Sequence, residues 1–96
     1  MLSKIELEGR LHGIKPVLTN KFHVSKLGYF GSYVYGKQTI NSDIDLLVEF
    51  SQPVDWGFFT LEKYLEQELG IPVDLVTKNA LKDQMKESIL NQVIYI

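Results

Sequence analysis

The sequence has no cysteine, and its 96 residues include only three prolines and one tryptophan. Without thiols the chain can form neither disulfide bonds nor thiolate metal sites, so any bound metal must be held by oxygen or imidazole. A reducing compartment suits such a chain, and we expect a cytoplasmic protein. No apolar run is long enough to cross a bilayer, and residues 1–6 lack the apolar stretch of a signal peptide, so no membrane association is expected.

A strong excess of one charge is also missing. The formal net charge is −2, and acidic and basic residues are interspersed along the chain instead of forming blocks. Long phosphate backbones are usually bound by a basic surface, so extended nucleic acid is not an expected partner. A single nucleotide is compatible with this charge, because metal ions and backbone amides can neutralise its phosphates.

The composition that remains is that of one globular domain spanning residues 1–96, with 45% hydrophobic and 23% charged residues. Apolar segments typical of strands alternate with segments of helical periodicity. The expected strands are residues 26–30, 43–50 and 72–76, and the expected helices are residues 2–14, 56–69 and 81–89. This alternation predicts an α+β two-layer fold, in which helices pack on a small mixed sheet of three or four strands.

Local signals refine these helices and the chain end. Gly9 and Gly13 are expected to interrupt the first helix, and Pro16 to open a further turn. Asp55 is expected to cap the start of the helix over residues 56–69, and Gly70 to follow its end. The last four residues form either a terminal strand or a packed tail.

Three aspartates interrupt segments that otherwise resemble protein core. Side chains alternate along a strand, so Asp43 and Asp45 are expected on one face with their Cα atoms roughly 6.6 Å apart. Asp74 lies among the apolar residues of the third expected strand. Neither strand contains Lys or Arg, and unpaired buried carboxylates are unfavourable. A cation shared by all three would explain them together, and oxygen ligands suit magnesium or manganese. His12 and His23 lie far from these acids in sequence and are given no role.

The turn at Gly31 and Ser32 follows the first expected strand and precedes the acids. Its backbone N–H groups and hydroxyl could receive phosphate oxygens, and glycine permits close approach of the backbone. Taken alone, a Gly-Ser pair is usually an ordinary bend, and each aspartate alone could be a cap or a solvated acid. The ordered combination of the turn and the acids is hard to obtain by accident and favours a site.

The combination resembles the signature of the DNA polymerase beta-like nucleotidyltransferase superfamily. Gly31-Ser32 is followed after ten residues by Asp43-Ile44-Asp45, and Asp74 follows on a later strand. Within the superfamily the short chain looks most like the minimal nucleotidyltransferases, small antitoxins commonly paired with HEPN-domain toxins. The resemblance covers roughly residues 25–77 and implies the palm fold of the superfamily.

The resemblance implies a magnesium-dependent transfer of AMP from ATP or of a nucleoside monophosphate from another triphosphate. Asp43 and Asp45 would bind two Mg²⁺ ions, with Mn²⁺ as an alternative, and Asp74 would complete the catalytic metal site and help to activate the attacking hydroxyl. Gly31 and Ser32 would hold the β- and γ-phosphates.

Three further positions bear on nucleotide binding. Many relatives carry arginine where this chain has Tyr35, and Lys37 could replace it as a point charge without its bidentate geometry. Ser42, directly before the first acid, is included with Lys37 among the expected nucleotide-binding residues.

The resemblance also implies an acceptor, a tyrosine of a partner HEPN toxin that loses its ribonuclease activity on adenylylation. Two alternatives stay open: an antitoxin that neutralises its toxin by binding alone, and a transferase for small molecules. Homo- and hetero-oligomers are both compatible with the sequence. Trp56, Phe58 and Phe59 could contribute to a partner surface, although at least two of them are expected to be core residues.

Overall fold

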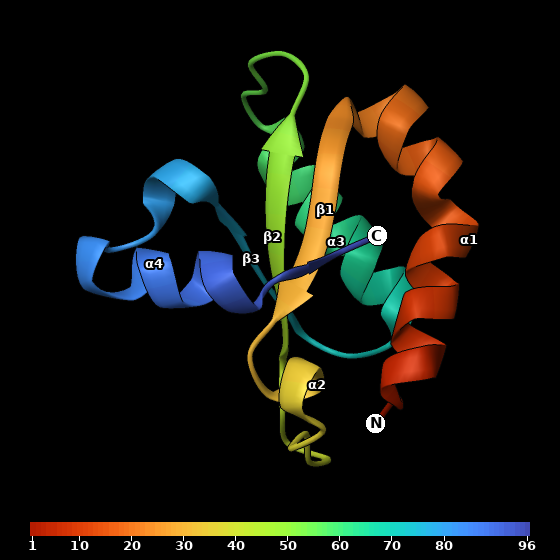
Figure 1. Ribbon diagram of the computed structural model, residues 1–96. Coiled ribbons are helices and arrows are strands. Elements are labelled where there is room, and N and C mark those ends of the chain that lie inside the picture. The colour runs from red at the N-terminus through yellow and green to blue at the C-terminus, as the bar shows by residue number, and fades with distance from the viewer.

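A mixed sheet of four strands forms the centre of the protein (Figure 1), whose computed structural model describes all of residues 1–96. The elements are α1 Lys4–Phe22, β1 Val24–Phe30, α2 Ser32–Tyr35, β2 Ile44–Phe50, α3 Gly57–Leu69, β3 Val73–Thr77, a 3₁₀ turn Lys78–Ala80, α4 Asp83–Gln92 and β4 Ile94–Tyr95. The predicted α+β architecture is confirmed. No helix has the length and apolar composition needed to cross a membrane.

The strand order is β3-β2-β1-β4, which the sequence did not reveal. β1 runs antiparallel to both β2 and β4, whereas β2 and β3 are parallel and are joined by the crossover helix α3. The edge strand β3 is held against this helix by the carboxylates of Glu66 and Glu62, which accept hydrogen bonds from the N–H groups of Val73 and Leu75. These bonds occupy part of the sheet edge and fix the start of β3.

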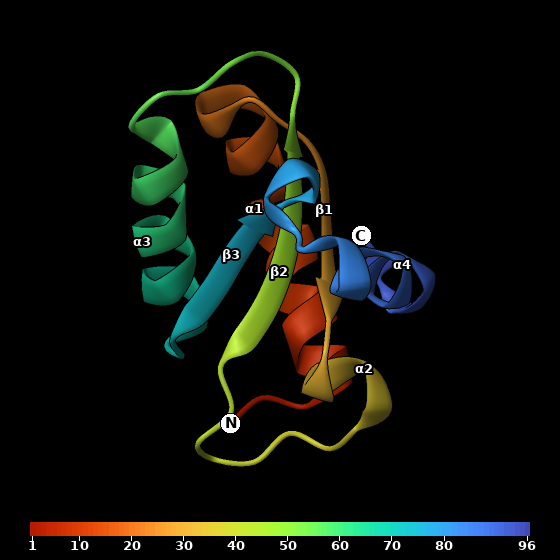
Figure 2. The same ribbon diagram turned by 90° about the vertical axis from the view of Figure 1, so that its left-hand side faces the viewer.

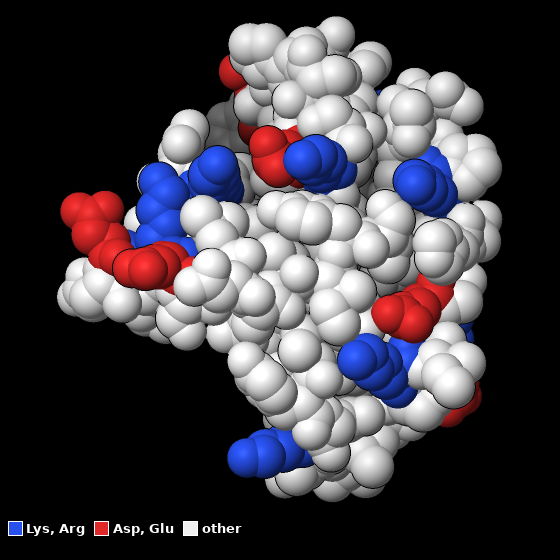
Figure 3. Space-filling view, viewed as in Figure 1, with Lys and Arg blue, Asp and Glu red and all other residues white.

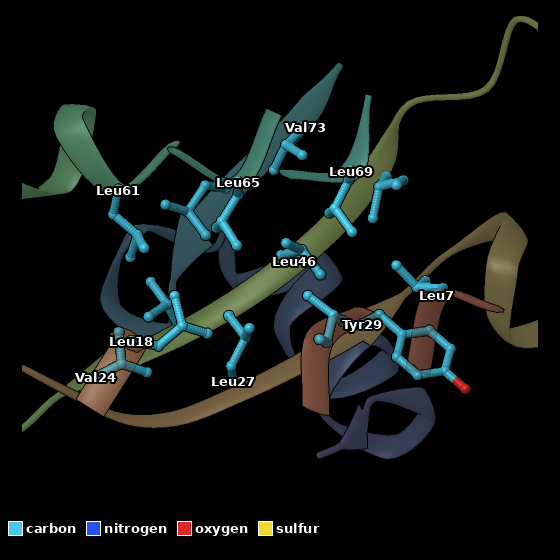
Figure 4. Close-up of a cluster of buried hydrophobic side chains, with 14 of the residues drawn as sticks. Leu7, Leu18, Val24, Leu27, Tyr29, Leu46, Leu61, Leu65, Leu69 and Val73 are labelled. Carbon is cyan, nitrogen blue, oxygen red and sulfur yellow. The ribbon is translucent and has the colours of Figure 1, made fainter. Parts of the chain in front are cut away.

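The two faces of the sheet are covered unequally. Figure 2 shows α1 and α3 on one side of the strands and α4 alone on the other. The side of α1 and α3 contains a cluster of 17 buried residues, among them Leu46, Leu65 and Val73 (Figure 4). The side of α4 contains only three buried hydrophobic residues, Phe30, Leu47 and Ile89. Most of the apolar stabilisation therefore comes from one face.

Helix α1 is continuous, so the predicted interruption is wrong. Gly9 and Gly13 are solvent-exposed on the helix, and Pro16 lies inside it. Because Pro16 has no N–H, the carbonyl of His12 lacks its helical hydrogen bond. His12 is exposed, so water can supply the missing donor. The buried positions continue through the expected break: they are Leu7, Leu11, Leu18 and Phe22. Packing of this stripe against the sheet overrides the local preference of glycine and proline.

Other element boundaries also moved. β1 begins at Val24, two residues before the expected start, and α3 has no side-chain N-cap because Trp56, not Asp55, occupies that position. Gly70 follows α3 in the left-handed conformation, as expected. Trp56 and Phe59 are 80% and 59% exposed, and only Phe58 packs against the core, so the expectation of at least two core aromatics is wrong.

The C-terminal residues form the short strand β4, which pairs with β1 at Gly28 and Tyr29. A Cβ atom on Gly28 would lie 2.7 Å from Val93 Cγ2 and 2.9 Å from the Ile94 carbonyl oxygen. Glycine is therefore required for the chain following α4 to reach the sheet. The N–H of Ile96 completes the attachment by donating to the carbonyl of Leu27 at 3.0 Å.

Candidate active site

Asp45 and Asp74 lie directly opposite each other on the parallel strands β2 and β3. Residues paired in register share a face of the sheet, and neighbouring strands are about 4.8 Å apart. The adjacent residues Ile44, Leu46 and Val73 are buried in the large cluster on the other face, so core packing turns both aspartates away from it. The sequence alternation thus brings together two of the three predicted acids.

Asp43 lies just outside this pair. β2 begins at Ile44, so the prediction that Asp43 belongs to the strand is wrong, and its side chain is exposed at the end of the loop before β2. Its negative charge still acts on Asp45. As the structure stands, no three His, Cys, Asp or Glu side chains form a group that could hold one metal ion.

Electrostatic repulsion between the acids contributes to an altered pKa of the half-buried Asp45. Burial, followed by the charges of Asp74 and Asp43, raises the pKa of Asp45 from its usual 3.8 to about 6. Each charged neighbour that contributes to this shift is acidic, so the ionised site is short of positive charge. Carboxylate oxygens in such a setting suit a hard divalent cation, which would lower the repulsion between them.

The turn after β1 approaches the same carboxylate. Gly31 has a positive φ of 77°, which favours glycine, and a Cβ atom on it would collide with Oδ2 of Asp45. The partly exposed Ser32 follows as the first residue of α2. The predicted turn and the predicted acids are therefore contiguous, and only a residue without a side chain fits between them.

A hollow of about 490 Å³ opens beside these residues. The strands contribute Phe30, Asp45 and Asp74, and the turn after β1 contributes Gly31. Helix α4 contributes Gln84, Met85, Ser88, Ile89 and Gln92. None of these helical residues was predicted from the sequence to belong to the site. The repeat of polar residues at positions 84, 88 and 92 was an available signal, because residues four apart share one helix face. It could not be connected to the acids without the strand order.

One of these helical side chains bonds the turn directly. The N–H of Gly31 donates to Oε1 of Gln92 at 2.8 Å, a contact that is partly buried and joins residues 61 positions apart. The carboxamide nitrogen of Gln92 points the other way and donates to the Ser88 carbonyl at 3.4 Å. The end of α4 is thus attached to the turn through one side chain.

The remaining predicted nucleotide-binding residues lie in or next to the loop between α2 and β2. Lys37 is exposed near the start of this loop. The hydroxyl of Ser42 accepts from the N–H of Thr39 at 2.9 Å and so closes a turn within the loop. Tyr35 is 62% exposed and borders a second hollow, which Gln84, Ser88 and Gln92 also line.

The largest hollow, about 600 Å³, lies at the opposite ends of β2 and β3. Its lining includes Phe50, Val54 and Phe58, and Glu49 is its single acid. It lacks the paired carboxylates and the glycine turn, so size does not identify the chemical site. The charged residues on the face shown in Figure 3 are also scattered, with no extended block of positive charge.

Comparison with known families and sequences points to one activity. A family model for the nucleotidyltransferase domain matches residues 11–96. The protein adenylyltransferase MntA of Thermococcus cleftensis is 42% identical over 97 residues, an alignment that covers 100% of this chain and 98% of that relative.

Solved structures agree with the sequence comparison. A proposed minimal nucleotidyltransferase of known structure superimposes with a TM-score of 0.83 at 26% identity, covering 97% of this chain and 95% of that one. A toxin–antitoxin complex with AMP-PNP gives a TM-score of 0.67 at 25% identity, covering 98% of this chain and 72% of the matched chain.

Proposed function

Because the chain belongs to the nucleotidyltransferase domain family and is a minimal nucleotidyltransferase, we propose that it transfers AMP from ATP to a tyrosine of a partner HEPN toxin. Asp74 takes up the proton of the tyrosine hydroxyl, whose oxygen attacks the α-phosphorus. The bond from this phosphorus to the oxygen that bridges to the β-phosphate breaks, and pyrophosphate leaves with that oxygen. The observation that carries this proposal is the in-register pair Asp45 and Asp74, with Gly31 against the first of them.

The acids are proposed to hold two magnesium ions. Asp45 and Asp43 would hold both ions, Asp74 would complete the catalytic site, and the raised pKa of Asp45 supports the need for a cation. When bound, the ions would neutralise charge on the triphosphate and on the departing pyrophosphate. Asp43 is exposed at the end of the loop before β2, and it would join the other two acids around the cations.

Gly31 and Ser32 are proposed to orient the triphosphate. The absence of a side chain at Gly31 lets phosphate oxygens approach the backbone beside Asp45, and the Ser32 hydroxyl adds a donor. Holding the α-phosphorus and the acceptor oxygen in line accounts for much of the expected rate enhancement. Lys37 and Ser42 contribute from the neighbouring loop, Lys37 as a mobile point charge.

The partner is inferred from the relatives. One relative is named a protein adenylyltransferase, and a structural neighbour is a toxin–antitoxin complex with a nucleotide analogue. Residues 1–96 form one sheet and its covering helices, and none of these elements makes a separate lobe for an acceptor. We therefore assign acceptor binding to the partner's own surface, and place the reaction in the cytoplasm.

Tyr35 supports a second candidate, an antitoxin that acts by binding alone. The exposed phenol of Tyr35 stands where the family resemblance implies an arginine, so one bidentate phosphate contact would be missing. This substitution would weaken triphosphate binding without altering the paired acids.

The two candidates are separated by incubating the protein with its genomic neighbour, magnesium and α-labelled ATP. Transfer predicts label on a tyrosine of the neighbour, loss of toxin ribonuclease activity, and loss of both on Asp45→Asn. Inhibition without label, unchanged by Asp45→Asn, would establish neutralisation by binding. The exposed Asp55→Asn is the matched control and should transfer label normally.

A further inference from the structure

The backbone N–H of Gly31, which faces the phosphates in the proposed function, is already hydrogen-bonded to Gln92. A backbone N–H has one hydrogen, and in good geometry it serves one acceptor. Here that acceptor is Oε1 of Gln92 at 2.8 Å, within the hollow that also contains Asp45 and Asp74. A phosphate oxygen bonded to Gly31 would need the same position.

We propose that Gln92 is an internal competitor of the nucleotide, whose carboxamide oxygen stands in for a phosphate oxygen at Gly31 until the triphosphate displaces it. The inference rests on the proposed function and adds a residue that sets nucleotide affinity. Helix α4 then has two roles: it covers Leu47 and Phe30, and it carries the side chain that competes with the nucleotide.

The surroundings of Gln92 show which movement displaces it. Its backbone ends α4 and is followed within two residues by β4, which pairs with β1 at Gly28. Atoms of Val93 and Ile94 pack where a Gly28 side chain would be, so the chain after Gln92 is firmly placed. Rotation of the Gln92 side chain releases the amide, whereas removal of the whole helix is unnecessary.

The energetic consequence follows from competition. A neutral hydrogen bond of this kind adds only modestly to stability. The arrangement in which Gln92 is bonded to Gly31 therefore predominates without excluding the nucleotide. The apparent affinity is reduced by the fraction of molecules in which Gly31 is free. Removing the competing oxygen should therefore tighten nucleotide binding, an outcome opposite to that expected for a direct nucleotide contact.

Two variants separate loss of the oxygen from loss of volume. Gln92→Ala removes the whole carboxamide, and Gln92→Met retains a side chain of similar length without a strong acceptor. Calorimetric titration with magnesium and α,β-methylene-ATP should give a Kd lower than wild type by roughly three- to ten-fold for both variants. Asn91→Ala, an exposed neighbour on the same helix, is the control and should leave Kd unchanged.

A second measurement follows the amide itself. In proton–nitrogen NMR spectra without nucleotide, the Gly31 resonance should move upfield and exchange faster with solvent in both Gln92 variants. Addition of the ATP analogue to wild type should shift the carboxamide resonances of Gln92, because its oxygen no longer accepts from Gly31. The Gly31 N–H should stay hydrogen-bonded, now to the phosphate. A purely structural role for Gln92 predicts lower thermal stability with no gain in affinity.

Each result has a defined meaning. Weaker nucleotide binding in both variants would overturn the inference by making Gln92 a nucleotide contact, and tighter binding only in Gln92→Ala would attribute the effect to space. Unchanged Kd with an altered Gly31 resonance would also overturn it, because phosphate would then not use this amide. In these cases wild type still binds the analogue, whereas no binding by any variant would refute the proposed function itself.

Discussion

The two faces of the sheet divide stability and chemistry between them. One face is covered by α1 and α3 over 17 buried residues, and the other carries a three-residue cluster, the acids and α4 (Figure 2). Adjacent residues of the same strand serve opposite purposes: Leu46 is buried in the core, and Asp45 is left half-buried beside another carboxylate. Packing on the first face makes it possible to maintain repulsion on the second.

Shortening two neighbouring leucines of β2 should show the difference between the two faces most strongly. Leu46 and Leu47 are both fully buried but lie on opposite faces, in the large and the small cluster. Leu46→Ala should lower the free energy of unfolding by about 3–5 kcal/mol. Leu47→Ala should lower it by about 2–3 kcal/mol, because α4 can shift and partly fill the cavity left by Leu47. Denaturant unfolding measures both, and equal losses would contradict the division between the faces.

Replacing an acid of the chemical face should have the opposite effect on stability. Asp45→Asn should lower the transferase rate by at least about 100-fold, by analogy with loss of other charge-stabilising groups. It should also raise the free energy of unfolding at pH 8 by about 1 kcal/mol, after allowance for the solvent exposure of the carboxylate. Thermal unfolding and label transfer on one preparation test both effects, and a destabilised variant would refute the repulsion argument.

The transferase activity of the face that carries Asp45 should depend on pH. Since burial and neighbouring acids raise the pKa of Asp45 to about 6, kcat/KM should fall about tenfold per pH unit below that value as the carboxylate takes up a proton. Raising the magnesium concentration should move the midpoint to lower pH, because cation and proton compete. A midpoint insensitive to magnesium would assign the titration to another group.

The linked effect on folding has the opposite sign. The folded state binds the proton of Asp45 more tightly than the unfolded state, whose pKa is near 3.8. Stability from this group is therefore gained as pH falls through about 6 toward 3.8, and Asp45→Asn should lack this component.

The smallest expected effect concerns the rim of the site. Tyr35→Arg should tighten triphosphate binding by roughly five-fold through a charge-assisted contact, with little change in stability because Tyr35 is 62% exposed. Tyr35→Lys, which lacks the fork of the guanidinium, is the matched comparison and should recover less. An equal gain from both would show that charge alone is missing.

The sequence predicted best what depends on local periodicity. The strands carrying Asp45 and Asp74, the helix over residues 57–69 and the adjacent glycine turn all follow from alternation and from nearby Gly and Pro signals. That Asp45 and Asp74 lie opposite each other depends on a strand order that no local signal specifies; the family resemblance implied only that these acids act together.

What sequence analysis missed depends on distant contacts. α1 is continuous because a stripe from Leu7 to Phe22 packs on the sheet despite Gly9, Gly13 and Pro16. Gln92 joins the site through one hydrogen bond across 61 positions, which periodicity cannot reveal. The roles of the acids, of Ser42 and of Lys37 in binding metal or nucleotide stay predictions.

The exposed rings of Trp56 and Phe59, 6.2 Å apart, lie at the start of α3. This position is beyond the far end of β2, about 17 Å along the strand from Asp45, and α3 covers the opposite face of the sheet (Figure 2). A protein that contacts both these rings and Asp45 would therefore have to extend over the length of β2 and onto both faces of the sheet.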